Sequence, residues 1–158
     1  DPDYLRRCGV QLERLLFARP QPDQAVALLL DLVQSRQARL VLVDGLPEIL
    51  AQRAGARAFN GAIGRLRTLA RTAGCAVLFV DEAGPAWQRW LQLDGAATLR
   101  QNVALHVMLQ REQWLKAAGT LVGYKARAQV LRSRWRSDAP SAALDIVFNG
   151  TVHARPTW

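Results

Sequence analysis

The sequence has few cysteines, almost no lysine and no long apolar run. Its two cysteines, Cys8 and Cys75, lie in apolar or helical surroundings with no second ligand nearby. This excludes a disulfide framework and a zinc site, and it predicts two reduced, buried thiols. No apolar stretch approaches the roughly 20 residues that a membrane-spanning helix needs, and no charged-then-apolar signal segment opens the chain. We therefore expect a cytoplasmic protein without a membrane partner.

Charge is biased toward arginine. The chain has 158 residues, half of them hydrophobic, which suits one globular domain with a single core. It carries 21 Lys+Arg against 13 Asp+Glu, a formal charge of +8, and its only lysines are Lys116 and Lys125. An anionic partner is therefore favoured. Arginine binds phosphate through a planar fork, but arginine in place of lysine also follows from GC-rich coding. Composition alone therefore does not decide between these two explanations.

Helical and strand-like segments alternate in the first half of the chain. Residues 3–8 resemble the end of a helix that Gly9 stops, which predicts a fragment of a longer chain. Residues 14–20 are a short apolar run closed by proline, which predicts a strand. Residues 40–43 are all apolar, as expected for a parallel strand covered on both faces. Between these segments Asp23 is a candidate N-cap, and a helical face is predicted from Val26, Leu29, Leu30 and Val33.

The same alternation follows once more and then changes. Residues 56–72 predict a helix that Gly74 ends, and residues 75–80 predict a second apolar strand. After residue 102, four strand-like segments lie close together without helices between them, which predicts antiparallel pairing. The expected fold class is α/β: a mostly parallel sheet with flanking helices, extended by C-terminal antiparallel strands. The inward residues of the second helix would be Phe59, Ile63, Leu66 and Ala70.

Carboxylates follow both predicted parallel strands. Asp44 ends the first, and Asp81 and Glu82 end the second. Ligands of open α/β sheets collect at the carboxyl ends of the strands, where an unpaired carboxylate needs a cation or a donor. In nucleotide-hydrolysing folds that cation is Mg²⁺, held directly or through water. The alternative is that Asp44 only caps the turn at Gly45 or the helix after it.

The order of these motifs resembles the RecA-type recombinases. In that family an Asp-Pro-x-Tyr helix leads through Gly-Val and a Leu-Leu strand to a Gln-Pro turn, a helix and the strand that ends in the Walker B aspartate. The resemblance continues through "RLRTLARTAGCAVLFVDE" and "YKARAQVLRSRWRSDAPSAALDIVFNG" and covers nearly the whole chain. It implies a single RecA-like ATPase core domain over residues 1–158. The matching residues are Asp1, Pro2, Tyr4, Gly9, Val10, Leu15, Leu16, Pro20 and Asp44.

The resemblance also implies a nucleotide site. Asp44 would organise Mg²⁺ and water for ATP hydrolysis, and Arg132 and Arg134 would reach ATP bound in a neighbouring subunit. This requires self-association into a filament or a ring. Basic residues at i and i+2 of a strand point to one face, so they can present a double cation to a γ-phosphate. The alternative is a solvated basic edge strand.

The resemblance places two DNA-binding segments, at residues 50–58 and 83–99. Aromatic rings beside arginines can stack bases and hold the phosphates of single strands. Alternatively, Trp87, Trp90 and Leu91 at i, i+3 and i+4 form the apolar face of a short helix. The residues so assigned to single-stranded DNA are Arg53, Arg57, Trp87, Arg89, Trp90 and Arg100.

Two departures limit these expectations. The phosphate-binding G-x-x-x-x-G-K-[ST] loop is absent, so this chain should not hydrolyse ATP unaided. Glu82 stands where the family has a glutamine, and it could instead orient the attacking water. The leading hypothesis is an ATP- and single-stranded-DNA-binding protein of DNA repair, recombination and the SOS response. The alternatives are a non-catalytic RecA-like accessory protein that binds other DNA-repair proteins, and a hexameric helicase or clock-type ATPase of the same superfamily.

Overall fold

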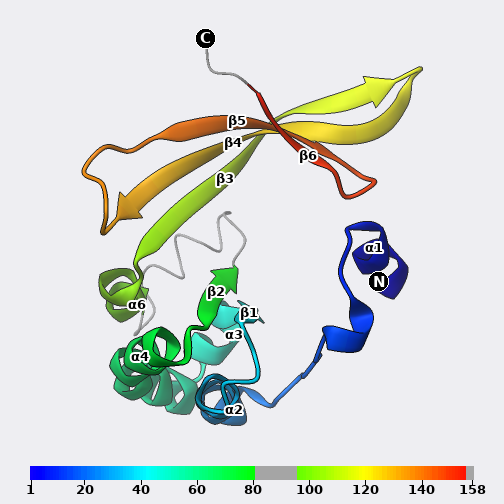
Figure 1. The fold of residues 1–158 in the computed structure, drawn as a ribbon. Helices are drawn as coiled ribbons and strands as arrows, with labels where there is room; N and C mark the ends of the chain where they lie inside the picture. The colour runs from blue at the N-terminus through cyan, green and yellow to red at the C-terminus, as the bar shows by residue number, and fades with distance from the viewer. Residues whose placement is uncertain (81–95, 156–158) are drawn as a thin grey trace. The chain divides into compact units, whose positions relative to one another are not determined.

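The structure is a computed structural model that describes residues 1–80 and 96–155 (Figure 1). The chain divides into two compact units. One comprises Asp1–Phe17 and Ala104–Trp158, and the other comprises Ala18–Val103. That residues 1–158 form a single domain stays a prediction.

The unit Ala18–Val103 joins helices to a parallel strand pair. The strands β1 (Leu40–Asp44) and β2 (Ala76–Val80) pair in parallel, in register from Leu40 opposite Ala76 to Asp44 opposite Val80. This confirms the parallel pairing predicted for the two apolar runs. The helices are α2 (Pro22–Gln34), α3 (Leu46–Ala51), α4 (Arg53–Ala73) and α6 (Ala96–Asn102).

The core of this unit lies between the helices and one face of the strand pair. Phe59 of α4 meets Phe79 of β2 edge-on, with the ring centroids 5.8 Å apart. The predicted inward residues of α2 and α4 are confirmed, because all of them are buried or pack against the buried cluster. Gly74 ends α4 in the left-handed conformation, with φ of 64°. The most completely buried side chains are Phe59, Leu46 and Val33.

The opposite face of the strand pair is open in the part of the chain that the structure describes. Leu40, Leu42 and Leu78 are 58%, 56% and 49% exposed, respectively. Successive side chains of a strand point to opposite faces, and only the alternate residues Val41 and Val43 pack against the core. The prediction that residues 40–43 are covered on both faces is therefore wrong for these described residues.

Two local predictions for residues 14–23, on either side of the boundary between the units, are wrong. Residues 14–20 do not form a strand: a 3₁₀ helix, Leu12–Arg14, is followed by irregular chain, and Phe17 is 80% exposed. A strand needs a hydrogen-bonded neighbour, and no described strand pairs with this run. Helix α2 begins two residues earlier than an N-cap at Asp23 predicts, at Pro22, with Gln21 as the N-cap. Proline is favoured at this first helical position because its φ is already helical.

The other unit begins with α1 (Pro2–Arg7). The carboxylate of Asp1 accepts hydrogen bonds from the backbone N–H groups of Asp3 and Tyr4, at 2.9 and 3.3 Å. Residues 3–8 therefore belong to a short helix with its own N-cap, where the sequence predicted only a helix end. Cys8 after this helix is exposed, contrary to prediction, whereas Cys75 of the other unit is buried as predicted.

Four antiparallel strands complete this unit, as predicted. They are β3 (Leu105–Ala117), β4 (Thr120–Ser133), β5 (Ser141–Val147) and β6 (Val152–Arg155), paired in chain order. Figure 1 shows them as one twisted sheet, coloured from yellow-green at β3 to red at β6. The fold class predicted from the sequence is confirmed: α/β, with a parallel part followed by antiparallel strands. No helix within residues 1–80 and 96–155 has the length and apolarity to cross a membrane.

Candidate nucleotide and nucleic-acid site

Asp44 stands at the carboxyl edge of the parallel strand pair. It is the last residue of β1, its side chain is exposed, and its register partner is Val80, the last residue of β2. The next residue, Gly45, has a φ of 80°, a left-handed conformation that glycine adopts without a steric cost, and it turns the chain into α3. Asp81 and Glu82, predicted to share this edge, lie outside the described residues.

The capping alternative for Asp44 finds no support. The N-cap of α3 is Gly45, and no side chain caps that helix. Within residues 1–80 and 96–155, no hydrogen bond or ion pair involves the Asp44 carboxylate. A charged oxygen pair at a strand end that binds none of the described groups is available to a cation or to water.

Glu48 is a second carboxylate near this edge that the sequence analysis did not single out. A methyl group built on Gly45 would lie 3.6 Å from Oε2 of Glu48, so this side chain folds back over the turn after Asp44. Its signal in the sequence is weak, an acidic residue in the first turn of a short helix.

The donor set fits Mg²⁺ bound through water and a nucleotide. Mg²⁺ is typically held by one or two carboxylates together with waters and substrate phosphates. Asp44, with Glu48 near the same turn, supplies oxygens of that kind. A metal site built only from protein ligands is not supported, because no group of three acidic, histidine or cysteine residues gathers within the described ranges.

Arg132 and Arg134 lie at the end of β4. Arg132 is the register partner of His106, and the backbone N–H of Arg134 donates to the carbonyl of Ala104 at 2.9 Å. Strand-like pairing therefore continues one residue beyond Ser133, where β4 ends. Residues two apart on such a segment lie on the same side, so the structure keeps the i, i+2 arrangement on which the prediction rests. Both arginines are exposed.

The turn after these arginines is held by its own hydrogen bonds. The hydroxyl of Ser133 accepts from the backbone N–H groups of Trp135 and Arg136, at 3.1 and 3.2 Å. The guanidinium of Arg136 donates to both carboxylate oxygens of Asp138, at 2.9 and 2.7 Å. These bonds hold the pKa of the Asp138 carboxyl below its ordinary value. Trp135, which this turn carries, was not among the predicted site residues.

Arg53 and Arg57, which the resemblance placed in the first DNA-binding segment, lie on helix α4. Residues 50–58 close α3 and open α4, with Gln52 alone between the two helices. Both arginines are exposed and stand one helical turn apart, so they face the same side. Helix α4 carries five arginines and no acidic residue, which makes it the most basic element of this unit.

The second predicted DNA-binding segment is described only in part. Trp87, Arg89 and Trp90 lie outside the described residues. Arg100 lies in α6, half-buried. Helix α6 packs against α4, where Arg67 donates to the Asn102 side chain at 3.4 Å. The structure therefore brings the helices of Arg53, Arg57 and Arg100 into one unit.

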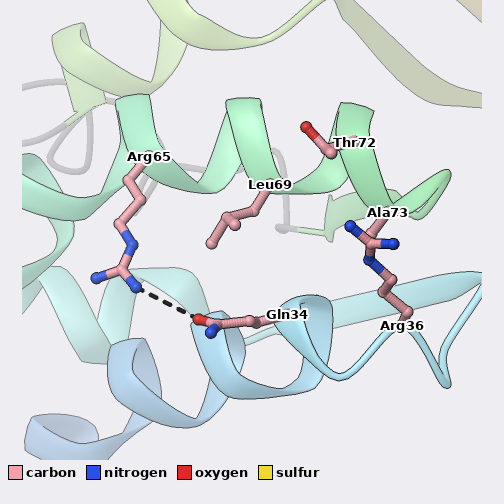
Figure 2. Close-up of a pocket in the computed structure, with 6 residues that line it drawn as sticks. All are labelled: Gln34, Arg36, Arg65, Leu69, Thr72 and Ala73. Atoms are coloured by element: carbon pink, nitrogen blue, oxygen red, sulfur yellow. Dashed lines mark hydrogen bonds between the residues drawn. The ribbon is translucent and has the colours of Figure 1, made fainter.

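A pocket of about 290 Å³ lies between α2 and α4 (Figure 2). Arg65 of α4 donates to the side-chain oxygen of Gln34 at 3.3 Å, and Leu69 points into the space between them. Arg36 stands at the other end, close to Ala73. None of the predicted site residues lines this pocket, so we assign it no part in the nucleotide site.

No family model matches the chain. Protein RecA 1 of Myxococcus xanthus is 23% identical to it, across 97% of this chain and 50% of the relative. Protein RecA of Chlorobium limicola is 21% identical, across 98% and 49% respectively. Protein RecA of Synechococcus sp. strain CC9605 is 25% identical, across 94% and 44%.

The chain is similar to RecA proteins. It spans about half the length of the curated relatives it matches, at an identity of 19–25%. The resemblance inferred from the sequence motifs is confirmed at this level, as a RecA-like chain. The roles of individual residues stay predictions.

Proposed function

We propose that this protein is a RecA-like ATP- and single-stranded-DNA-binding protein that acts in the cytoplasm, in DNA repair and recombination. The observation that carries the proposal is the position of Asp44, exposed at the carboxyl end of a parallel strand pair. Ligands of α/β sheets bind at such strand ends. The similarity to RecA proteins, which extends over nearly the whole chain, supports the same assignment.

The nucleotide in this proposal is ATP with Mg²⁺. When bound, Mg²⁺ would supply positive charge that offsets the negative charge developing during phosphoryl transfer. Asp44 would hold the water shell of the metal, and Glu48 would keep the edge of the site acidic. Glu82 would orient the attacking water. This chain has no phosphate-binding loop, so it supplies only part of the site.

Arg132 and Arg134 would complete the site of a neighbouring subunit. They lie on the same side of an extended segment and are exposed. A pair of fixed cations stabilises the negative charge that develops on a transferring phosphoryl group. The nucleotide would then lie between subunits, and ATP would promote self-association into a filament or a ring.

Single-stranded DNA would bind along helix α4 of the unit Ala18–Val103. Arg53 and Arg57 lie one turn apart on α4, and no acidic residue of that helix opposes a phosphate. Arg100 would add a further cation, together with Trp87, Arg89 and Trp90. Neutralising phosphates releases counterions, so this binding would weaken as salt rises.

The test of the nucleotide role is charge removal at the end of β4. In the full-length protein, Arg132→Gln with Arg134→Gln should abolish ATP-promoted assembly, measured by sedimentation velocity with and without Mg-ATP. A control variant, Arg6→Gln with Arg19→Gln, removes the same charge from two exposed arginines outside the proposed sites and should assemble normally. Equal assembly of both variants would contradict the proposal. Electron microscopy of the assembly distinguishes a filament from the ring of a hexameric helicase or clock-type ATPase.

A second candidate is a non-catalytic RecA-like accessory protein that binds other DNA-repair proteins. The exposed leucines Leu40, Leu42 and Leu78 favour it, because one apolar face of the strand pair is open in the described chain. Assembly that does not respond to Mg-ATP, together with DNA binding that does not depend on Arg53 and Arg57, would favour this candidate over the first.

A further inference from the structure

Trp135 is the most exposed tryptophan among the described residues of its unit, and of the aromatic residues there only Phe17 is more exposed, at 80%. The side chain of Trp135 is 73% exposed, compared with 43% for Trp114 and 42% for Phe148. A large aromatic surface in water is unfavourable, and tryptophan is enriched at recognition sites because it buries a large area when a partner binds. Trp135 is therefore a candidate recognition residue.

The backbone that carries Trp135 is fixed by two sets of bonds. Ser133 accepts the backbone N–H of Trp135 itself and that of Arg136. Arg136 is in turn held by both oxygens of Asp138. A group presented on a pre-ordered turn loses little conformational entropy when it binds.

The charges around Trp135 determine what kind of ligand fits. Arg134 and Arg136 flank it in sequence, and Arg132 lies two residues before Arg134 on the same side. The single carboxylate of the turn, Asp138, is engaged by Arg136. An apolar protein pocket that enclosed the ring would have to desolvate these guanidinium groups, whereas a nucleic acid offers a flat base beside a phosphate.

We propose that Trp135 stacks on an unpaired nucleobase whose adjacent phosphate is held by Arg132 and Arg134. This extends the proposed function and rests on it, because it adds a base-binding residue to the end of β4. The base could come from a single-stranded oligonucleotide or from a free nucleotide, since both offer a π-face next to phosphate. Stacking on an aromatic side chain is tolerant of base identity, so little sequence preference is expected.

Trp114 provides a matched control. The guanidinium of Arg111 lies over its ring, 4.2 Å from the centroid, and the ring also packs edge-on against Tyr124. Trp114 is thus a tryptophan beside an arginine, with one face of its ring covered by that guanidinium. A substitution there removes the same chromophore and the same volume without removing a presented stacking surface.

The experiment measures binding of labelled oligo-dT, and of an abasic strand of equal length, by fluorescence anisotropy with the full-length protein. Trp135→Ala should weaken oligo-dT binding about tenfold, which is the order of affinity that one stacked base contributes, and leave abasic-strand binding unchanged. Trp135→Phe should restore most of the affinity. Trp114→Ala should bind both strands as the unsubstituted protein does. A parallel titration with labelled ATP identifies the source of the base: a loss confined to ATP assigns the site to a free nucleotide.

The outcomes separate the inference from the proposed function. Oligo-dT and ATP binding that are both unaffected by Trp135→Ala would overturn the inference and leave the proposed function intact. An equal loss on the abasic strand would also overturn it, because the tryptophan would then act only by holding the arginines. No binding of either strand by the unsubstituted protein would reject the proposed DNA binding itself, and the inference would then be overturned only if ATP binding is also unaffected by Trp135→Ala.

Discussion

Asp44 and Val80 are register partners at the last positions of the parallel strands β1 and β2. Both strands therefore end at one edge, and Asp44 carries its carboxylate there without a hydrogen bond to any described group. The position of the Asp44 carboxylate at this edge gives a direct way to test the metal role.

We predict that Asp44→Asn lowers Mg²⁺-dependent ATP turnover of the full-length protein about 100-fold or more, a loss typical for one group that stabilises developing charge. The change keeps the size of the side chain and removes the charge that would hold the water shell of the metal. A steady-state ATPase assay measures it. Asp31→Asn, at an exposed position of α2, is the control and should turn over ATP normally. Unchanged turnover in Asp44→Asn would show that the metal role is wrong.

The chain of residues 1–158 by itself should show no ATP turnover above background, with or without oligo-dT. It has no G-x-x-x-x-G-K-[ST] loop to hold the phosphates. Release of inorganic phosphate from Mg-ATP measures this. Turnover that co-purifies with the chain and falls in Asp44→Asn would contradict the expectation.

Two glycines of α4 should respond oppositely to alanine. A Cβ on Gly55 would collide with the carbonyl oxygen of Ile49, whereas a Cβ on Gly64 meets nothing within 4 Å. Gly55→Ala should lower the free energy of unfolding by about 1–3 kcal/mol through overpacking. Gly64→Ala should raise it by about 0.5–1 kcal/mol, because alanine favours the helix. Urea unfolding followed by circular dichroism compares the two, and a free energy of unfolding that is unchanged or higher in Gly55→Ala would refute the packing around Gly55.

Arg36 offers a stabilising change at the end of α2. It has a φ of 59°, in the left-handed region that side chains other than glycine rarely adopt, and it follows the C-cap Ser35. Arg36→Gly should raise the free energy of unfolding by about 1 kcal/mol, because glycine adopts this conformation without the penalty of roughly 1–2 kcal/mol. Arg36→Ala keeps the strain and removes only the guanidinium, so it should show no such gain in thermal unfolding. A gain of equal size in both variants would locate the effect in the guanidinium.

The stability of the turn that carries Trp135 should depend on pH through the ionisation of Asp138. Hydrogen bonds from Arg136 hold the pKa of Asp138 below its ordinary value. A carboxyl whose pKa is lower in the folded state stabilises the fold above its unfolded pKa, and that contribution is lost as the pH falls through the folded pKa. Carboxyl carbon shifts measured by NMR should show the low pKa of Asp138. Arg136→Gln should raise this pKa, whereas Arg111→Gln, at a residue that stacks on Trp114, should leave it in place. A pKa of Asp138 that is the same in Arg136→Gln would contradict the ion pair.

The elements that the sequence predicted correctly are those with a strong local pattern. The inward faces of α2 and α4 follow from the spacing of their apolar residues, and β1 and β2 follow from short continuous apolar runs. The strand predicted at residues 14–20 was wrong because strand formation depends on a pairing partner, which the local sequence does not reveal. The open face of β1 was missed for a related reason, since an all-apolar run is read as buried on both sides.

The candidate site could be predicted in part. Asp44 follows from its place after an apolar strand, and the shared side of Arg132 and Arg134 follows from strand alternation. Glu48 and Trp135 could not be found in this way. The position of Glu48 depends on the turn at Gly45, and that of Trp135 on hydrogen bonds within its own turn. Such contacts become visible only in three dimensions.

The most direct test of the central claim is anisotropy of labelled oligo-dT titrated with the protein across a salt series, with and without Mg-ATP. The account predicts tight binding at about 50 mM salt that weakens steeply toward about 200 mM, with a linear dependence of log K on log salt, and a change in affinity when Mg-ATP is added. Anisotropy that stays flat at low salt, with and without Mg-ATP, would contradict a single-stranded-DNA-binding function.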